Sequence, residues 1–478
     1  MRTFLSRLAV ILVLLSPLTA PAQDASLANV AKAMGAAGVK SIQYSGNGTN
    51  FQLGQNFSPD VPWPRFVVKS YTRAVNYDSA SIRDELVRTQ GENPPRGGGG
   101  QPVAGEQRQI FVASGDFAWN VAADVVTPTP IALIDRQLQL WTTPQGVVKA
   151  AMAHNATVQG RTISFTAPGR FKVLATIDAQ NLVERIDAVA PNAVLGDVPV
   201  EIRYSEYKDF AGVKFPTRIR QTIGGYPTLD LTVTDVQPNV AVDIAVPDPI
   251  KQTPAPYSKV ATQMVADGVW YITGGSHHSV LIEMKDHLIL VESPLNDERA
   301  AAVLAEVKSL VPNKPIKYVI ATHHHFDHAG GLRAVAAEGI TLIAHDVNKA
   351  FLEKALAGPA TIRPDRLAKS GKKGTVEGMR DKRVLTDGTR TVELHNVAGN
   401  NHHAGIVMVY LPKEKLLVEA DVYNPPAPNA PPPASVNTNW VNLSDNIKRL
   451  GMNVDQILPL HGRIMPIAEL HKSIGHSH

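Results

Sequence analysis

The feature that most constrains this chain is a run of ten residues, Thr322 to Gly331, which holds five potential metal ligands within six positions. The apolar residues 318–321 directly before it predict a buried strand, and the two glycines at 330–331 allow the chain to turn into a helix. Histidine-rich tracts can also be low-complexity metal scavengers. A scavenging tail would not need a strand-to-helix frame, so the pattern favours a metal site at the carboxyl end of a strand, where open α/β sheets place their chemistry.

The spacing of the ligands within this run points to two cations rather than one. His323 and His325 are two positions apart, so they point to the same side of an extended segment. Asp327 and His328 follow where the strand ends, and they can reach a second point nearby.

The pattern His323-x-His325-x-Asp327-His328 resembles the HxHxDH signature of the metallo-β-lactamase superfamily. The resemblance extends over about residues 260–470 and implies an α/β fold, the αββα sandwich of that superfamily. The strands and helices that we expect before and after the signature, such as a helix over 297–310 and a strand over 316–321, occur in an order that fits this sandwich.

The resemblance also indicates where the remaining ligands lie. His402, in the segment 399–405, resembles the third ligand of the first ion, with His403 as the alternative. Asp421 stands where the superfamily has a bridging carboxylate, although Ala420 replaces the usual glycine before it. His461 resembles the ligand of a terminal PGHG step, with leucine in place of the glycine before the histidine.

The expected site therefore holds two Zn²⁺ ions, one on His323, His325 and His402 and the other on Asp327, His328 and His461, with Asp421 across both. All these ligands offer nitrogen or oxygen, which suits zinc and leaves iron or manganese open. Two cations that share a water would make hydroxide available near neutral pH, and the catalytic residue Asp327 would orient it and take up its proton. We expect His278 and His403 to contact the substrate.

The first half of the chain differs, because only one of the 16 histidines, His154, precedes residue 250. Many short segments of alternating polarity predict a mainly antiparallel β domain. The segment 204–216 is similar to strand-turn-strand pieces of periplasmic lipoprotein-carrier-like half-barrels. This domain would either present a concave surface to an apolar ligand or serve as a structural neighbour of the catalytic domain.

Residues 1–22 resemble a secretory signal peptide, with two arginines, an apolar core and an A-x-A cleavage site. We therefore expect a periplasmic or secreted protein without a transmembrane segment in its mature form. The chain has no cysteine, which excludes disulfides and thiolate ligands. The 478 residues divide into a signal peptide at 1–22, a β-rich domain at 23–246, a proline-rich linker at 247–257, a catalytic domain at 258–470 and a tail at 471–478.

The formal net charge of +4 falls to about +2 without Arg2 and Arg7. A charge this close to zero does not indicate nucleic-acid binding. We expect a small-molecule substrate, and the sequence leaves the oligomeric state open. The leading hypothesis is an exported dinuclear zinc hydrolase of a carboxylic ester, lactone or amide bond, β-lactams included. A basic insert at 358–383 supports phosphoester or sulfate-ester hydrolysis as the alternative. A third hypothesis is an apolar-ligand binding protein with a vestigial metal site.

Overall fold

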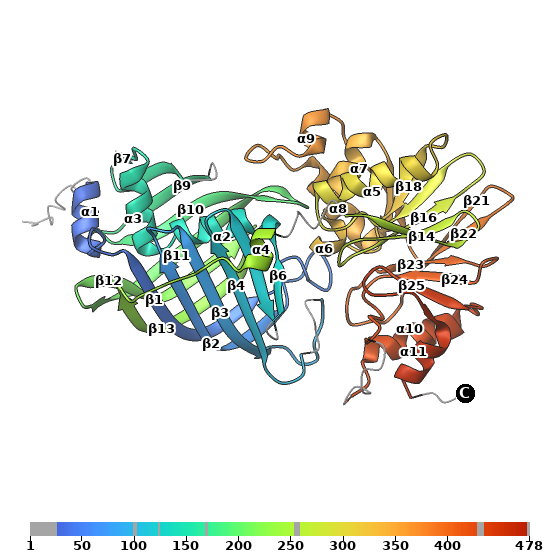
Figure 1. Ribbon diagram of the computed structural model, residues 1–478, viewed down its shortest axis with the longest axis horizontal. Coiled ribbons are helices and arrows are strands. Elements are labelled where there is room, and N and C mark those ends of the chain that lie inside the picture. The colour runs from blue at the N-terminus through green and yellow to red at the C-terminus, as the bar shows by residue number, and fades with distance from the viewer. Residues whose placement is uncertain are drawn as a thin grey trace, which may run out of the picture.

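The computed structural model describes residues 26–98, 103–122, 125–167, 171–252, 259–427 and 435–475. The predicted signal peptide and residues 476–478 of the predicted tail lie outside these ranges. Two domains stand side by side, a β-rich N-terminal domain and a mixed α/β C-terminal domain (Figure 1).

The N-terminal domain is one antiparallel sheet of 13 strands, as the alternating pattern predicted. The strand order β6-β5-β4-β3-β2-β1-β13-β12-β11-β10-β9-β8-β7 joins two meanders through the pairing of β1 with β13. The strands are β1 (Ser41–Phe51), β2 (Arg65–Asn76), β3 (Ser81–Gln90), β4 (Gln107–Ser114), β5 (Phe117–Ala122), β6 (Val125–Pro128), β7 (Thr157–Gln159), β8 (Thr162–Ala167), β9 (Phe171–Ile177), β10 (Val183–Asn192), β11 (Gly196–Phe210), β12 (Val213–Ile223) and β13 (Tyr226–Pro238).

Helices fill the inner face of this sheet. The segment η1 (Pro130–Ala132), α2 (Leu133–Trp141) and α3 (Pro144–Ala153) connects the edge strand β6 to the opposite edge strand β7. Side chains of these helices and of α1 (Leu27–Met34) share one buried core with strands from both meanders. This face is therefore packed with the domain's own helices, which weakens the hypothesis that it captures an apolar ligand.

The C-terminal domain contains two sheets packed face to face. One sheet has the order β14 (Ala261–Ala266), β15 (Val269–Thr273), β16 (Ser279–Glu283), β17 (Leu288–Val291), β18 (Ile316–Ile320), β19 (Thr341–His345) and β20 (Thr375–Met379), and it is parallel from β17 onward. The other has the order β21 (Lys382–Thr386), β22 (Thr391–Asn396), β23 (Val407–Leu411), β24 (Leu416–Glu419), β25 (Gln456–Pro459) and β26 (Met465–Pro466). Apolar side chains from both sheets form one core between them.

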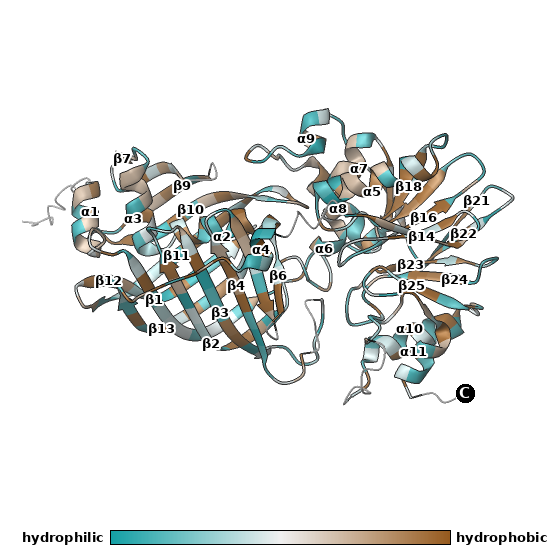
Figure 2. Cartoon of the chain, in the orientation of Figure 1, coloured by the Kyte–Doolittle hydropathy of each residue, from teal (hydrophilic) through white to brown (hydrophobic). Residues whose placement is uncertain are grey.

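Helices cover the outer face of each sheet, so the predicted αββα sandwich is confirmed. One face carries α5 (Asp297–Leu310), α7 (Leu332–Glu338) and α8 (Asp346–Ala357), and the other carries α10 (Thr438–Arg449) and α11 (Ile467–Ser473). The central strands are apolar along most of their length, because both of their faces are buried (Figure 2).

The prediction that residues 358–383 form a separate basic insert is wrong, because this segment contains parts of both sheets. After α9 (Arg366–Ser370), β20 continues the first sheet and β21 begins the second. Several of the cations pair with acids of the same domain, in Arg366–Asp297, Arg380–Asp346, Lys382–Glu393 and Arg383–Glu377. These pairs neutralise much of the charge that favoured an anionic substrate.

The predicted linker at 247–257 is described only in part. Residues 248–252 form the helix α4 (Asp248–Gln252), whose Ile250 packs in a small core against the N-terminal sheet. The domain boundary stays a prediction. Within the described residues, no helix has the length and apolar character needed to cross a membrane.

Replacing Leu281 with alanine should destabilise the C-terminal domain, because this fully buried side chain packs between the first sheet and its helices. We expect Leu281→Ala to lower the free energy of unfolding by about 2–5 kcal/mol. Urea-induced unfolding of the metal-free protein measures the change. The control Val384→Ala alters a side chain that is 47% exposed and should shift stability by less than about 0.5 kcal/mol. Equal effects of the two variants would contradict this core assignment.

Candidate metal centre

The candidate site lies where strands of both sheets end. His323 and His325 follow β18, and Asp327 and His328 belong to the short helix α6 (Phe326–Ala329). His402 comes from the loop between β22 and β23, whereas Asp421 follows β24. Asp421 has a positive φ of 60°, a backbone conformation that non-glycine residues adopt rarely and mainly at constrained sites.

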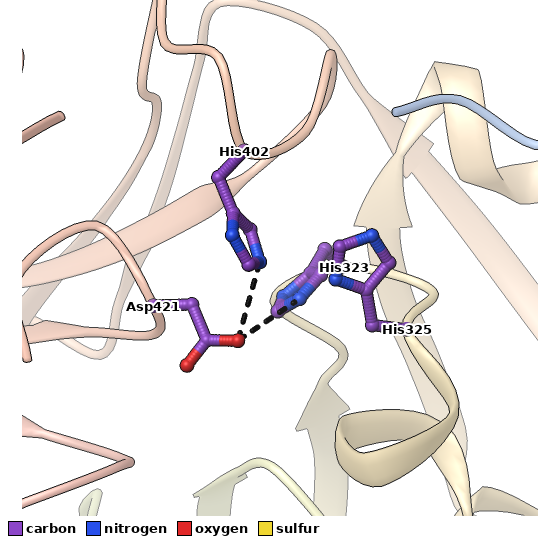
Figure 3. A group of neighbouring side chains, drawn as sticks. All are labelled: His323, His325, His402 and Asp421. Atoms are coloured by element: carbon purple, nitrogen blue, oxygen red, sulfur yellow. Dashed lines mark ion pairs between the residues drawn. The ribbon is translucent and has the colours of Figure 1, made fainter. Parts of the chain in front are cut away.

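Four of these side chains form a first group, namely His323, His325, His402 and Asp421, whose ligand atoms lie within 4.8 Å of one another (Figure 3). Among the described residues, three buried ring nitrogens of this group have no hydrogen-bond partner, namely His323 Nε2, His325 Nδ1 and His402 Nε2, and Asp421 Oδ2 lies 3.9 Å from His323 Nε2 and 3.2 Å from His402 Nε2. An unsatisfied buried polar atom costs roughly 1–3 kcal/mol, so three such nitrogens gathered beside a carboxylate fit a metal ion that binds them. All four donors are nitrogen or oxygen, as zinc accepts.

Hydrogen bonds determine which ring nitrogen of two histidines faces this point. Thr322 Oγ1 donates to Glu292 Oε1 at 2.8 Å, so it accepts the proton of His323 Nδ1 at 3.1 Å and leaves His323 Nε2 unprotonated. His325 Nε2 lies 2.9 Å from a main-chain carbonyl oxygen, that of Asn56, and must donate to it. His325 Nδ1 is therefore the free nitrogen. A histidine ligand whose second nitrogen donates in this way has a fixed tautomer and ring orientation.

The second group consists of His277, Asp327 and His328. Asp327 Oδ2 lies 3.3 Å from His277 Nε2 and 4.0 Å from His328 Nε2. Burial alone would raise the pKa of Asp327, but His328 and the hydrogen bond to His277 hold this pKa well below its usual value. The carboxylate is therefore ionised at neutral pH. Its side chain is 33% exposed, so it also meets solvent.

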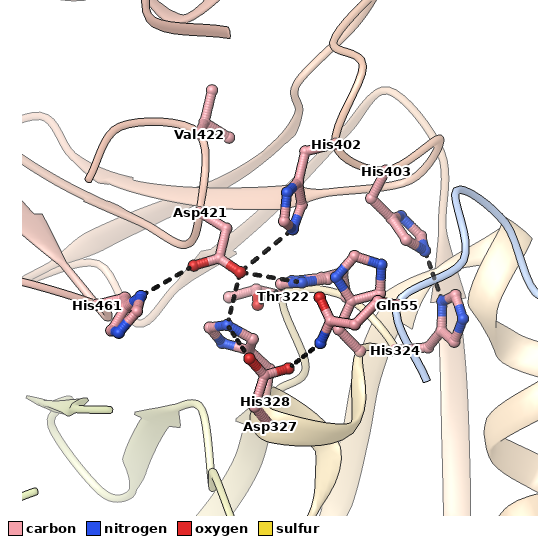
Figure 4. Close-up of polar contacts among 12 residues, drawn as sticks. Gln55, Thr322, His324, Asp327, His328, His402, His403, Asp421, Val422 and His461 are labelled. Atoms are coloured by element: carbon pink, nitrogen blue, oxygen red, sulfur yellow. Dashed lines mark hydrogen bonds and ion pairs between the residues drawn. The ribbon is translucent and has the colours of Figure 1, made fainter. Parts of the chain in front are cut away.

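Asp421 connects the two groups (Figure 4). Its Oδ2 lies 2.9 Å from His328 Nε2 and 3.2 Å from His402 Nε2. His461, predicted as a ligand of the second ion, lies outside both groups, with its Nδ1 3.7 Å from Asp421 Oδ1. The ring of His461 stacks on that of His277, with centroids 4.4 Å apart, so it borders the second group and its role as a ligand stays a prediction.

The two predicted substrate contacts lie away from the exposed side of the site. His278 Nε2 is 2.8 Å from the Gly462 carbonyl oxygen, and burial lowers the pKa of His278 to about 4. His403 is fully buried and accepts a hydrogen bond from Gly405 N at its Nδ1. Neither position supports substrate binding. His277, the neighbour of His278, is the residue that reaches Asp327.

Sequence reasoning missed Glu292, a buried carboxylate directly after β17 that accepts from His328 Nδ1 at 2.9 Å. Burial alone would lower the pKa of His328, but Asp421 and Glu292 raise it well above its usual value. Glu292 could have been found, because β17 is an apolar strand that ends beside β18, and an acid at that position meets the histidine run.

An αββα sandwich with two groups of histidine and aspartate side chains at the strand ends defines a class of metal-binding domains. The comparison with protein families agrees: residues 272–439 match the metallo-beta-lactamase superfamily. This chain therefore carries a domain of that superfamily, preceded by an antiparallel β domain.

Two curated proteins match parts of this chain. The 2,4-dinitroanisole O-demethylase subunit alpha of Nocardioides sp. (strain JS1661) is 27% identical over 207 residues, which are 42% of this chain and 57% of that protein. A linear primary-alkylsulfatase of Pseudomonas sp. is 33% identical over 75 residues, 16% of this chain and 11% of that protein. The chain thus spans little more than half of the first relative and a tenth of the second. Among solved structures, a metallo-beta-lactamase from Pontibacter korlensis is 18% identical and covers 46% of this chain and 98% of its own, with a TM-score of 0.35.

Replacing Glu292 with glutamine should weaken metal binding, because the amide cannot accept from both Thr322 and His328 with the strength of a carboxylate. Loss of such an outer partner typically lowers metal affinity about 10–100-fold. Competition with a chromophoric chelator measures the zinc affinity of Glu292→Gln. The exposed carboxylate Asp286 provides the control Asp286→Asn, which should bind zinc like the wild type. Unchanged affinity in Glu292→Gln would show that Glu292 does not orient the ligands.

Proposed function

We propose that this protein is an exported dinuclear zinc hydrolase that cleaves a carboxylic ester, lactone or amide bond. The observation that carries the proposal is the first group, in which three buried histidine nitrogens without hydrogen-bond partners among the described residues lie together with Asp421, next to a second group whose His328 also contacts Asp421. Because both groups are assembled, the alternative of a vestigial metal site loses its support.

Two zinc ions at these groups would lower the pKa of a shared water and polarise the carbonyl oxygen of a substrate. The chain's own residues supply the rest. Asp327 is ionised and partly exposed, and its Oδ2 can accept the proton of the attacking water. The ring of His461 stacks on the buried His277 and is itself 42% exposed, so His461 can contact and orient the substrate.

Sulfate-ester hydrolysis is the second candidate. One observation favours it: the relative that is 33% identical over 75 residues bears the name of a linear primary-alkylsulfatase. The basic segment 358–383 lends it less support than its composition indicated, because several of its cations are paired.

Elemental analysis of the purified protein tests the metal centre. We expect two zinc ions per wild-type chain and a sharp fall in His325→Ala, because this change removes the ligand atom His325 Nδ1. The exposed His154 supplies the control His154→Ala, which should keep both ions. A wild type that binds no zinc when zinc is supplied would overturn the proposal.

Hydrolysis assays with lactones, carboxylic esters, β-lactams, alkyl sulfates and phosphoesters test the substrate class. Turnover of the carbonyl compounds, lost in His325→Ala and retained in His154→Ala, would support the leading candidate. Turnover of alkyl sulfates alone would transfer the proposal to the second candidate.

The signal peptide predicted at residues 1–22 can be tested by following export of the protein. Expression of the full chain in a Gram-negative host should yield a periplasmic protein that begins at Gln23, after the A-x-A site. Amino-terminal sequencing of the periplasmic and cytoplasmic fractions measures this outcome. An unprocessed protein confined to the cytoplasm would contradict it.

A further inference from the structure

Two loops of the N-terminal domain reach the candidate metal centre. One is the segment 52–58 between β1 and β2, and the other includes residues 97–98 between β3 and β4. Their main chains form hydrogen bonds with two of the three segments that carry or adjoin ligands of the first group. Phe326 N donates to Gly54 O at 3.2 Å, Ala404 N to Phe57 O at 2.8 Å and Gly97 N to Asn401 O at 2.8 Å. The N-terminal domain is thus hydrogen-bonded both to the segment around α6 and to the 399–405 loop.

Gln55 holds the carboxylate of Asp327. Its Nε2 donates to Asp327 Oδ1 at 2.7 Å (Figure 4). The other oxygen, Asp327 Oδ2, lies near His277 Nε2. The two oxygens of Asp327 therefore have different partners from different domains, which fixes the rotation of the carboxylate. Gln55 is itself buried, and its main-chain N–H donates to Gln52 O, so its position is set by the loop.

Asn56 holds two neighbouring histidines at once. Its main-chain oxygen accepts from His325 Nε2, the bond that leaves His325 Nδ1 free for an ion. Its side-chain oxygen lies 2.8 Å from His324 Nε2, while its Nδ2 donates to Ser58 O and Val61 O. The side chain of Asn56 is thus used as an acceptor on one side and as a donor on the other, which an aspartate could not reproduce.

A chain of hydrogen bonds determines every proton position along this contact. Gly405 N donates to His403 Nδ1, so His403 carries its proton on Nε2 and donates it to His324 Nδ1 at 2.5 Å. His324 must then be protonated at Nε2, the nitrogen that faces Asn56. Each of the two rings accepts a hydrogen bond at its Nδ1, so both rings are neutral. The chain links the loop that carries His402 to the N-terminal domain.

Two glycines allow this close approach. A Cβ on Gly98 would stand 1.9 Å from Gln55 Oε1 and 2.9 Å from His325 Cε1. Gly54 has a φ of +70°, and a Cβ there would stand 2.2 Å from the Phe326 ring. Both positions exclude larger residues, so the loops fit the metal-bearing segment closely.

We propose that the N-terminal domain is an integral part of the metal centre, in which Gln55 positions Asp327 and Asn56 positions His325, so that metal binding depends on docking of the two domains. This inference rests on the dinuclear site of the proposed function. It assigns the domain a role that a merely adjacent structural domain would not have.

Zinc affinity of the variant Gln55→Met tests the role of Gln55. Methionine keeps the length of the side chain and removes the donor to Asp327 Oδ1. We expect one of the two ions, that of the second group, to bind about 10–100-fold more weakly, while the other is unchanged. The matched control is Gln52→Met in the same loop, whose side chain accepts from Arg88 within the N-terminal domain. Circular dichroism verifies that both variants fold.

A spectroscopic readout on the unaltered protein tests the role of Asn56. In metal-free, ¹⁵N-histidine-labelled wild type, His324, His325 and His403 should all show the tautomer with the proton on Nε2. This result does not depend on the folding of any variant. A His325 ring protonated on Nδ1 instead would overturn the role of Asn56.

The outcomes separate the inference from the proposed function. A wild type without zinc overturns the proposed function. Two ions in the wild type with unchanged affinity in Gln55→Met overturn the coupling to the N-terminal domain and leave the proposed function standing. A selective loss in Gln55→Met, absent from Gln52→Met, supports the inference.

Discussion

The structure is arranged around a set of buried ligand atoms whose hydrogen-bonding capacity the described residues leave unsatisfied. Three imidazole nitrogens lie close together without hydrogen-bond partners among the described residues, and each would cost folding free energy if nothing bound it. Such an arrangement persists only where a well-packed frame imposes it. Here the frame is a pair of sheets with a continuous apolar core between them and helices outside, which holds the strand ends, and hence the ligands, in place.

Around the ligands, a second layer of polar groups fixes the protons. Thr322, which donates to Glu292, determines the free nitrogen of His323. Glu292 also accepts from His328, and the main-chain oxygen of Asn56 determines the free nitrogen of His325. A neutral histidine has one donor and one acceptor nitrogen, so each of these contacts leaves the other nitrogen to the ion. The two domains share this task, and that sharing gives the N-terminal domain its connection to the chemistry.

Local patterns predicted much of the catalytic domain. A continuous apolar run indicated β18, and apolar residues at helical spacing indicated α5 with bounds that match the structure. The strand β3 (Ser81–Gln90) is hard to recognise from the sequence, because the charged Asp84 and Arg88 alternate with Ile82 and Leu86 on its buried face. The high charge of the segment containing β20 and β21 predicts a surface insert, but the segment forms strands of two sheets.

By itself, the sequence determined the class of the site, since the spacing of His323, His325, Asp327 and His328 on a strand-to-helix turn is a local property. Only the tertiary structure decided which atoms meet. It brought His277 rather than His278 to Asp327, set Glu292 behind His328, and buried His403 in a chain of hydrogen bonds. It also placed Gln55, 272 positions away in the chain, on Asp327. Such contacts arise from the docking of distant segments, and no periodicity or spacing along the chain records them.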